Sequence, residues 1–65
     1  MSKQDYLRRE VRLAKALEDD LYYKDMANYI GITEYSFYNF LKGYYDLSRE
    51  KERMLHDILI DLIDM

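Results

Sequence analysis

Apolar side chains recur along the chain with the period of an α-helix. Five of them lie three or four positions apart in its first part: Leu7, Val11, Ala14, Leu17 and Leu21. This spacing predicts a helix over about residues 3–18, with Ser2 as its N-cap and Asp5 as the acid of a capping box. Four cations fall mostly off that stripe and are expected to face solvent: Arg8, Arg9, Arg12 and Lys15.

A second, shorter helix is predicted over residues 23–30. Its inward positions are expected to be Met26, Ala27 and Ile30. Gly31 follows directly and is expected to end the helix, because glycine is preferred at a left-handed C′ position. Ile32 is then expected to lie in the turn as a buried plug.

A third helix is predicted over residues 34–42, with Thr33 as its N-cap and Gly43 at its end. Its inward positions are expected to be Phe37, Phe40 and Leu41. The segment between the second and third helices has the three to four residues that join the two helices of a helix-turn-helix.

A fourth helix is predicted from Ser48, its N-cap, to about Ile63. Its apolar stripe is Met54, Leu55, Ile58, Leu59 and Leu62. Ile60 and Ile63 lie to one side of this stripe, near His56. They form a candidate dimer seam, although a wide core contact with a few exposed apolar residues explains them equally well.

Composition favours one small folded domain over residues 1–65. The chain has 65 residues, 49% hydrophobic and 35% charged, with no cysteine and no proline. No apolar run approaches the length that spans a membrane, so a cytoplasmic protein is expected. An enzyme is not expected, because so small a core rarely holds a deep pocket. His56 has no second histidine or cysteine to share a metal, and we expect no catalytic residue, metal or cofactor.

Three residues of the predicted second and third helices carry a characteristic spacing. Ala27 is a small residue where the helices would cross closely, Gly31 follows four positions later, and the apolar Phe37 follows six after that. With this spacing as its motif, at about residues 22–43, the chain resembles the lambda-repressor/Cro-type helix-turn-helix family over roughly residues 5–62. An ordinary helical hairpin with a chance spacing is the alternative interpretation.

The resemblance implies a four-helix, lambda-repressor-like domain that acts in a genetic switch of a phage or mobile element. In that family the third helix enters the major groove of operator DNA, commonly as part of a dimer. Nine residues match the positions that contact DNA: Tyr23, Thr33, Glu34, Tyr35, Tyr38, Asn39, Lys42, Tyr44 and Tyr45. Asn39 is suited to adenine, Glu34 to cytosine, and Lys42 to phosphate.

The charge of the motif favours another partner. Residues 1–16 carry a net charge of +3, residues 17–47 carry −4 and residues 48–65 carry −2. DNA affinity depends heavily on cations that neutralise phosphates, and the third helix has only Lys42, at its far end. Arg12 and Lys15 of the first helix are expected to supply part of the missing charge.

Tyrosines are concentrated in the same segment, because seven of the eight lie between Tyr22 and Tyr45. Tyrosine is enriched at protein–protein interfaces. The alternative function is therefore an antirepressor whose acidic, tyrosine-rich surface binds a partner repressor and blocks its DNA binding. Tyr29 is expected to be partly buried in the core, whereas Tyr35 and Tyr38, with the pair after Gly43, are too clustered to be all core.

Overall fold

The computed structural model describes residues 3–63, apart from the side chain of Ile63. That part of the chain contains four α-helices and no strand: α1 (Asp5–Leu17), α2 (Tyr23–Ile30), α3 (Glu34–Leu41) and α4 (Arg49–Ile63). The all-α, four-helix prediction is confirmed. None of these helices is both long enough and apolar enough to cross a membrane.

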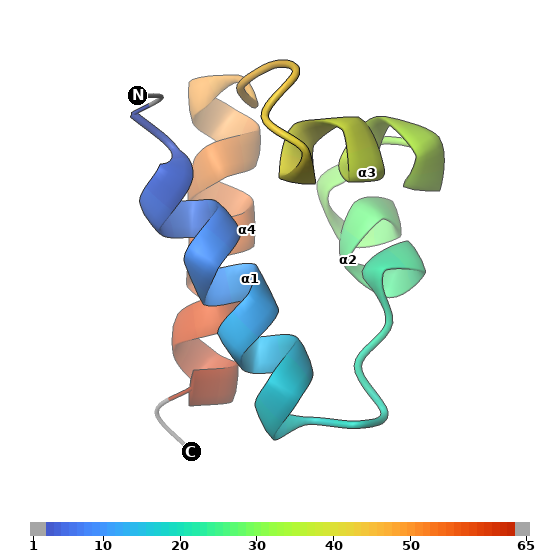
Figure 1. The fold of residues 1–65 in the computed structure, drawn as a ribbon, viewed down its shortest axis with the longest axis vertical. Helices are drawn as coiled ribbons and strands as arrows, with labels where there is room; N and C mark the ends of the chain where they lie inside the picture. Colours follow the sequence, from blue (N-terminus) through green and yellow to red (C-terminus); the bar gives the residue numbers. More distant parts are fainter. Residues whose placement is uncertain (1–2, 64–65) are drawn as a thin grey trace.

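The four helices pack into a domain of 28 × 22 × 20 Å (Figure 1). Helices α1 and α4 lie side by side and run in the same direction. Helix α3 lies at the end of this pair where both helices begin, and α2 packs against α3 and α4. Helices α2 and α3 therefore form one unit, which packs against the parallel pair of α1 and α4.

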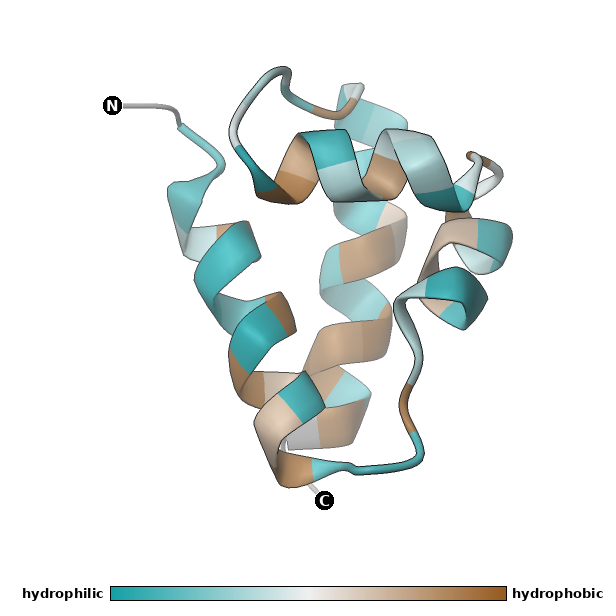
Figure 2. Ribbon diagram, turned by 45° about the vertical axis from the view of Figure 1, so that its right-hand side comes forward, coloured by the Kyte–Doolittle hydropathy of each residue, from teal (hydrophilic) through white to brown (hydrophobic). Residues whose placement is uncertain are grey.

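One apolar core joins all four helices, and Figure 2 shows the apolar positions turned toward the interior. Its buried members are Leu7, Val11, Ala14, Met26, Ala27, Ile30, Phe37, Phe40, Leu41, Leu47, Leu55 and Leu59. The inward positions predicted for α2 and α3 are thus confirmed. Packing of this kind supplies most of the stability of short helices, because propensity alone rarely does.

Both glycines end a helix in the same way. Gly31 has φ +84°, and the N–H groups of Gly31 and Ile32 donate to the carbonyls of Asn28 and Ala27. These two hydrogen bonds form a Schellman motif, which uses the free carbonyls at a helix end. Gly43 has φ +87° and ends α3 with the same pair of bonds. Ile32 packs against the core but is only half-buried, less than the predicted plug.

The predicted caps of α3 and α4 are present. Thr33 Oγ1 accepts a hydrogen bond from the Ser36 N–H at 3.0 Å. Ser48 Oγ accepts from the Lys51 N–H at 3.3 Å. Each hydroxyl satisfies one of the donors that a helix leaves unpaired at its first turn.

The start of α1 differs from the prediction. The helix begins at Asp5, two residues later than expected, and Ser2 lies outside the described residues. Gln4 occupies the N-cap position without a capping side-chain bond. Its amide instead bonds to the backbone of Leu47, at 2.9 and 2.8 Å. Asp5 is not a capping-box acid but pairs with Arg8.

Arg8 is buried, and the prediction that it faces solvent was wrong. Its side chain donates to the backbone carbonyls of Phe40 and Tyr45. The guanidinium also pairs with Asp5 and Asp46, at 3.0 Å each. The residue is only 3% exposed, because the end of α3 and the loop after it cover this side of α1. Helical spacing alone does not reveal a neighbour that is so distant in sequence.

Two apolar residues that were expected inside are instead exposed. Leu17, predicted on the core stripe of α1, is 60% exposed at the last position of the helix. Tyr29, predicted to be partly buried, is 56% exposed on α2. Both follow the helical periodicity of their neighbours, but the chain offers no element that covers them in residues 3–63.

Candidate functional site

Helix α3 presents one open side, which we call the α3 face. Its members come from the helix and from the loop that follows: Glu34, Tyr35, Tyr38, Asn39, Lys42, Tyr44 and Tyr45. The other side of the helix is held in the core by Phe37 and Phe40, whose ring centroids lie 5.9 Å apart. The packing of α3 against α2 thus decides which side chains remain available to a partner.

The first turn of α3 carries the acidic end of this face. Thr33 is exposed, and its hydroxyl is already used in capping. Glu34 is exposed beside it, where its carboxylate suits the positive end of the helix dipole. Tyr35 is 76% exposed, the largest value among the exposed large hydrophobic residues of the described chain. This end therefore offers a carboxylate and a phenol to solvent.

The middle of the face is more tightly packed. The ring of Tyr38 meets the ring of Tyr23 edge to face, with centroids 5.6 Å apart. Tyr23 also contacts Phe37 at 5.8 Å and is half-buried, so it acts mainly as a support for α3. Asn39 is half-buried.

The loop tyrosines extend the face beyond the end of α3. The Tyr45 hydroxyl donates to the Ser36 carbonyl at 2.7 Å, so this ring folds back along the helix. Tyr44 is 74% exposed, and Lys42 Nζ lies 6.0 Å from the centroid of its ring. The structure thus places all nine predicted contact residues on α3, on its flanks or against it.

Cations gather at the C-terminal end of the α3 face. Arg12 of α1 reaches the end of α3, where its Nη2 donates to the Leu41 carbonyl at 3.0 Å. Together with Lys42 it places positive charge at the negative end of the helix dipole. Lys15 lies instead over the ring of Tyr22, 5.0 Å from its centroid. Of the two α1 cations expected to supplement the motif, Arg12 lies against α3.

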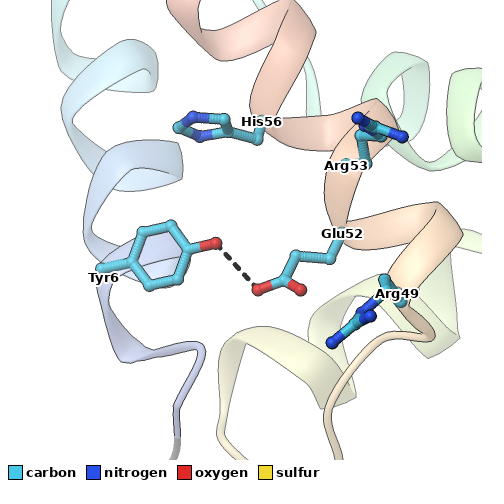
Figure 3. A pocket seen from close by; sticks show the side chains of 5 residues that line it. All are labelled: Tyr6, Arg49, Glu52, Arg53 and His56. Carbon is cyan, nitrogen blue, oxygen red and sulfur yellow. Dashed lines mark hydrogen bonds between the residues drawn. The ribbon is translucent and has the colours of Figure 1, made fainter.

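A polar cluster that sequence analysis missed joins α1 to α4 (Figure 3). The Tyr6 hydroxyl donates to a Glu52 carboxylate oxygen at 2.8 Å, and His56 Nδ1 lies 3.3 Å from Glu10 Oε2. The rings of Tyr6 and His56 meet edge to face, with centroids 6.1 Å apart. The partners are 46 residues apart in sequence, so no local pattern could reveal them.

This cluster borders a pocket of about 390 Å³ that is lined by residues of both α1 and α4 (Figure 3). Arg49 and Arg53 line it together with Tyr6, Glu52 and His56, so both signs of charge meet there. Partial burial of Tyr6 raises the pKa of its phenol to about 12, and the hydrogen bond and negative charge of Glu52 add to this effect. A phenol with so high a pKa stays protonated, and we assign the cluster a structural role. No group of three potential metal ligands occurs within the described residues.

The candidate dimer seam is described only in part. Ile60 is 41% exposed on α4, and the side chain of Ile63 lies outside the described residues.

The chain matches no protein-family model, no curated protein and no solved structure. The assignment of function therefore depends on the residues of the α3 face.

Proposed function

We propose that this protein is a small transcriptional regulator with a lambda-repressor-like fold, which binds operator DNA through α3 as a dimer. The observation that carries the proposal is that α3 is fixed to the domain along one side and exposed along the other. Gly31 turns the chain, Thr33 caps the helix and Phe37 fixes it in the core, while the opposite side remains open. A short helix held in this way is suited to enter a major groove.

Each part of the α3 face has a task in this proposal. Asn39 pairs with an adenine edge, and Glu34 accepts from the amino group of a cytosine. Lys42 and Arg12 contact phosphates at the end of the helix, where their charges are concentrated. The Tyr45 hydroxyl is already donated to Ser36, so Tyr44 is the better phosphate donor of the loop.

The test is a gel retardation assay with the DNA fragment upstream of the protein's own gene, at low salt. We expect a retarded band that Lys42→Ala weakens and Asn39→Ala makes less selective between sequences. Arg9→Ala is the matched control, because Arg9 is an exposed cation that borders Leu13 and Glu10 on another side of α1. Absence of retardation of any cognate fragment at low salt would overturn the proposal.

A second candidate function is favoured by the exposure of the tyrosines. Tyr35 and Tyr44 are both about three-quarters exposed, and Tyr35 follows Glu34 directly in the first turn of α3. Such a surface complements the basic, DNA-reading side of another repressor, which it would block as an antirepressor. Either function belongs to a genetic switch of a phage or mobile element, as the resemblance implies.

The second candidate is tested by co-purification with a repressor encoded beside this gene. We expect a complex that Tyr35→Ala weakens, because this side chain is exposed and its removal leaves the core intact. Arg9→Ala again serves as the control. A complex that is indifferent to Tyr35→Ala and Tyr38→Ala, or no complex at all, would count against the antirepressor.

A further inference from the structure

A second surface feature lies away from the α3 face. Helix α2, the loop before it and the last turns of α4 enclose an open groove of about 320 Å³. Its floor is apolar and consists of Leu21, Met26, Ile58 and Leu62. Met26 is fully buried beneath it, whereas the other three are only half-buried. The half-buried apolar residues at the edge of the core are therefore accessible to a partner at this place. We call it the α2–α4 groove.

Tyr29 forms one wall of the α2–α4 groove. Its ring is 56% exposed, although the helical pattern places it next to core positions. A large aromatic side chain beside accessible apolar residues is typical of interface centres, where it supplies contact area at a low entropic cost. The exposure of Tyr29 is thus a feature of this groove as well as a departure from the predicted core.

All the charge that lines the α2–α4 groove is negative. Asp25 and Asp61 border it, and no cation does so among the described residues. Neither carboxylate has an ion pair within residues 3–63. Further acids, Asp20 and Asp57, lie near them in sequence on the loop and on α4. The groove therefore combines an apolar floor with an acidic rim.

We propose that the α2–α4 groove binds an amphipathic, basic helix of a partner protein. The apolar side chains of that helix cover Leu21, Ile58 and Leu62, in the helix-in-groove mode of recognition. Its lysines or arginines pair with Asp25 and Asp61. These ion pairs compensate the two carboxylates for the water that they lose when the helix binds. The acidic rim excludes nucleic acid and selects against acidic partners.

This partner site is independent of the proposed function. None of the residues that line the α2–α4 groove belongs to the α3 face. One molecule is therefore able to engage a target through α3 and a basic helix through the groove at the same time. Failure of one activity does not entail failure of the other.

The first experiment uses a synthetic helical peptide of about 16 residues, with leucines at i, i+3, i+4 and i+7 and lysines on its flanks. The peptide is titrated into the full-length, ¹⁵N-labelled protein. We expect the amide signals of Leu21, Asp25, Tyr29 and Asp61 to shift, and that of Tyr35 to stay in place. A control peptide with glutamate at each lysine position is expected to cause no shift. Equal shifts with both peptides, or shifts confined to α3, would overturn the proposal.

The second experiment measures the affinity of the lysine peptide for variants of the protein. Tyr29→Ala is expected to weaken binding by about fivefold or more, while Tyr35→Ala, the matched exposed tyrosine, leaves it unchanged. Asp25→Asn combined with Asp61→Asn is expected to weaken binding about threefold and to reduce its salt dependence. Glu34→Gln is the control for this pair. Circular dichroism verifies that each variant is folded.

Two results would refute the proposal. One is a lysine-peptide affinity that none of the groove variants alters. The other is self-association of the protein alone, seen in sedimentation and abolished by Tyr29→Ala, which would assign the α2–α4 groove to a second copy of this chain.

Discussion

The side-chain amide of Gln4 and the backbone of Leu47 form two reciprocal hydrogen bonds, of 2.9 and 2.8 Å. Both residues are buried, and the bonds attach the start of α1 to the loop before α4. We expect Gln4→Ala to lower the free energy of unfolding by about 1–3 kcal/mol, because it leaves two buried backbone groups of Leu47 without partners. Urea denaturation measures this loss. The exposed neighbour Lys3→Ala is the control and is expected to change stability by less than about 0.5 kcal/mol.

Arg8 provides the second attachment of α1. We expect Arg8→Met to cost about 2–4 kcal/mol, because methionine retains the apolar stem but leaves Asp46 and the Phe40 carbonyl without this donor. The matched variant Arg9→Met changes an exposed neighbour and is expected to have little effect. Thermal and urea unfolding distinguish the two. Equal stabilities of these variants would contradict the role assigned to Arg8.

Gly43 permits a test of backbone conformation without steric conflict. A Cβ at this position would have no heavy atom within 4 Å, but φ is +87°. We therefore expect Gly43→Ala to destabilise the fold by about 1 kcal/mol through backbone strain alone. Gly43→Val is expected to cost more and Gly43→Asn less, since asparagine tolerates the left-handed region. An order of stability with valine above asparagine would show that this reasoning is wrong.

Tyr6 gives the fold a dependence on alkaline pH. Its pKa is about 12 in the folded protein, against 10.0 for an ordinary tyrosine. Because the folded state keeps this proton more tightly, the contribution of Tyr6 is complete below about pH 10 and is lost as the pH rises towards 12. The measurement is urea unfolding of the wild type and Tyr6→Phe at several pH values. We expect their difference in stability to shrink over this range.

The few cations near α3 predict a shallow salt dependence if the protein binds operator DNA. Lys42 and Arg12 lie at the end of the helix, and Lys24 is exposed on α2. About three phosphate contacts in each subunit, and so about six in the proposed dimer, give a slope of about −5 in a plot of log affinity against log salt concentration. Lys42→Ala removes one contact from each subunit and is expected to reduce the magnitude of this slope by about two. A slope near −8 would require cations that this surface lacks.

Local signals in the sequence were sufficient to predict the four helices and the ends of α2, α3 and α4, but not the start of α1. Gly31, Gly43, Thr33 and Ser48 act through groups a few residues away, so their roles follow from residue type and position. The bounds predicted for α2 match the structure, and those for α3 differ by one residue at its end. The composition of the α3 face was accessible for the same reason, because one helix and its loop supply most of it.

Contacts between distant segments were not accessible from the sequence. Arg8 has the spacing of a surface residue. It is buried only because the end of α3 and the following loop pack over it. Tyr6 and Glu52 are separated by 46 positions, and neither belongs to a recognisable motif. Tyr29 is exposed because no other helix in residues 3–63 packs against its side of α2. These features are determined by how the helices are arranged, which periodicity does not specify.

The attachments of α1 also suggest an order of folding. The bonds that hold this helix connect Gln4 and Arg8 to residues 32 to 43 positions away, whereas α2 and α3 are joined by a short turn. Closing the longer loop costs more chain entropy, so we expect α2 and α3 to associate first and α1 to dock late. Detachment of α1 is then expected to be the partial unfolding that requires the least free energy. It would expose the Phe40 carbonyl and the adjoining core to proteases before the α2–α3 unit opens.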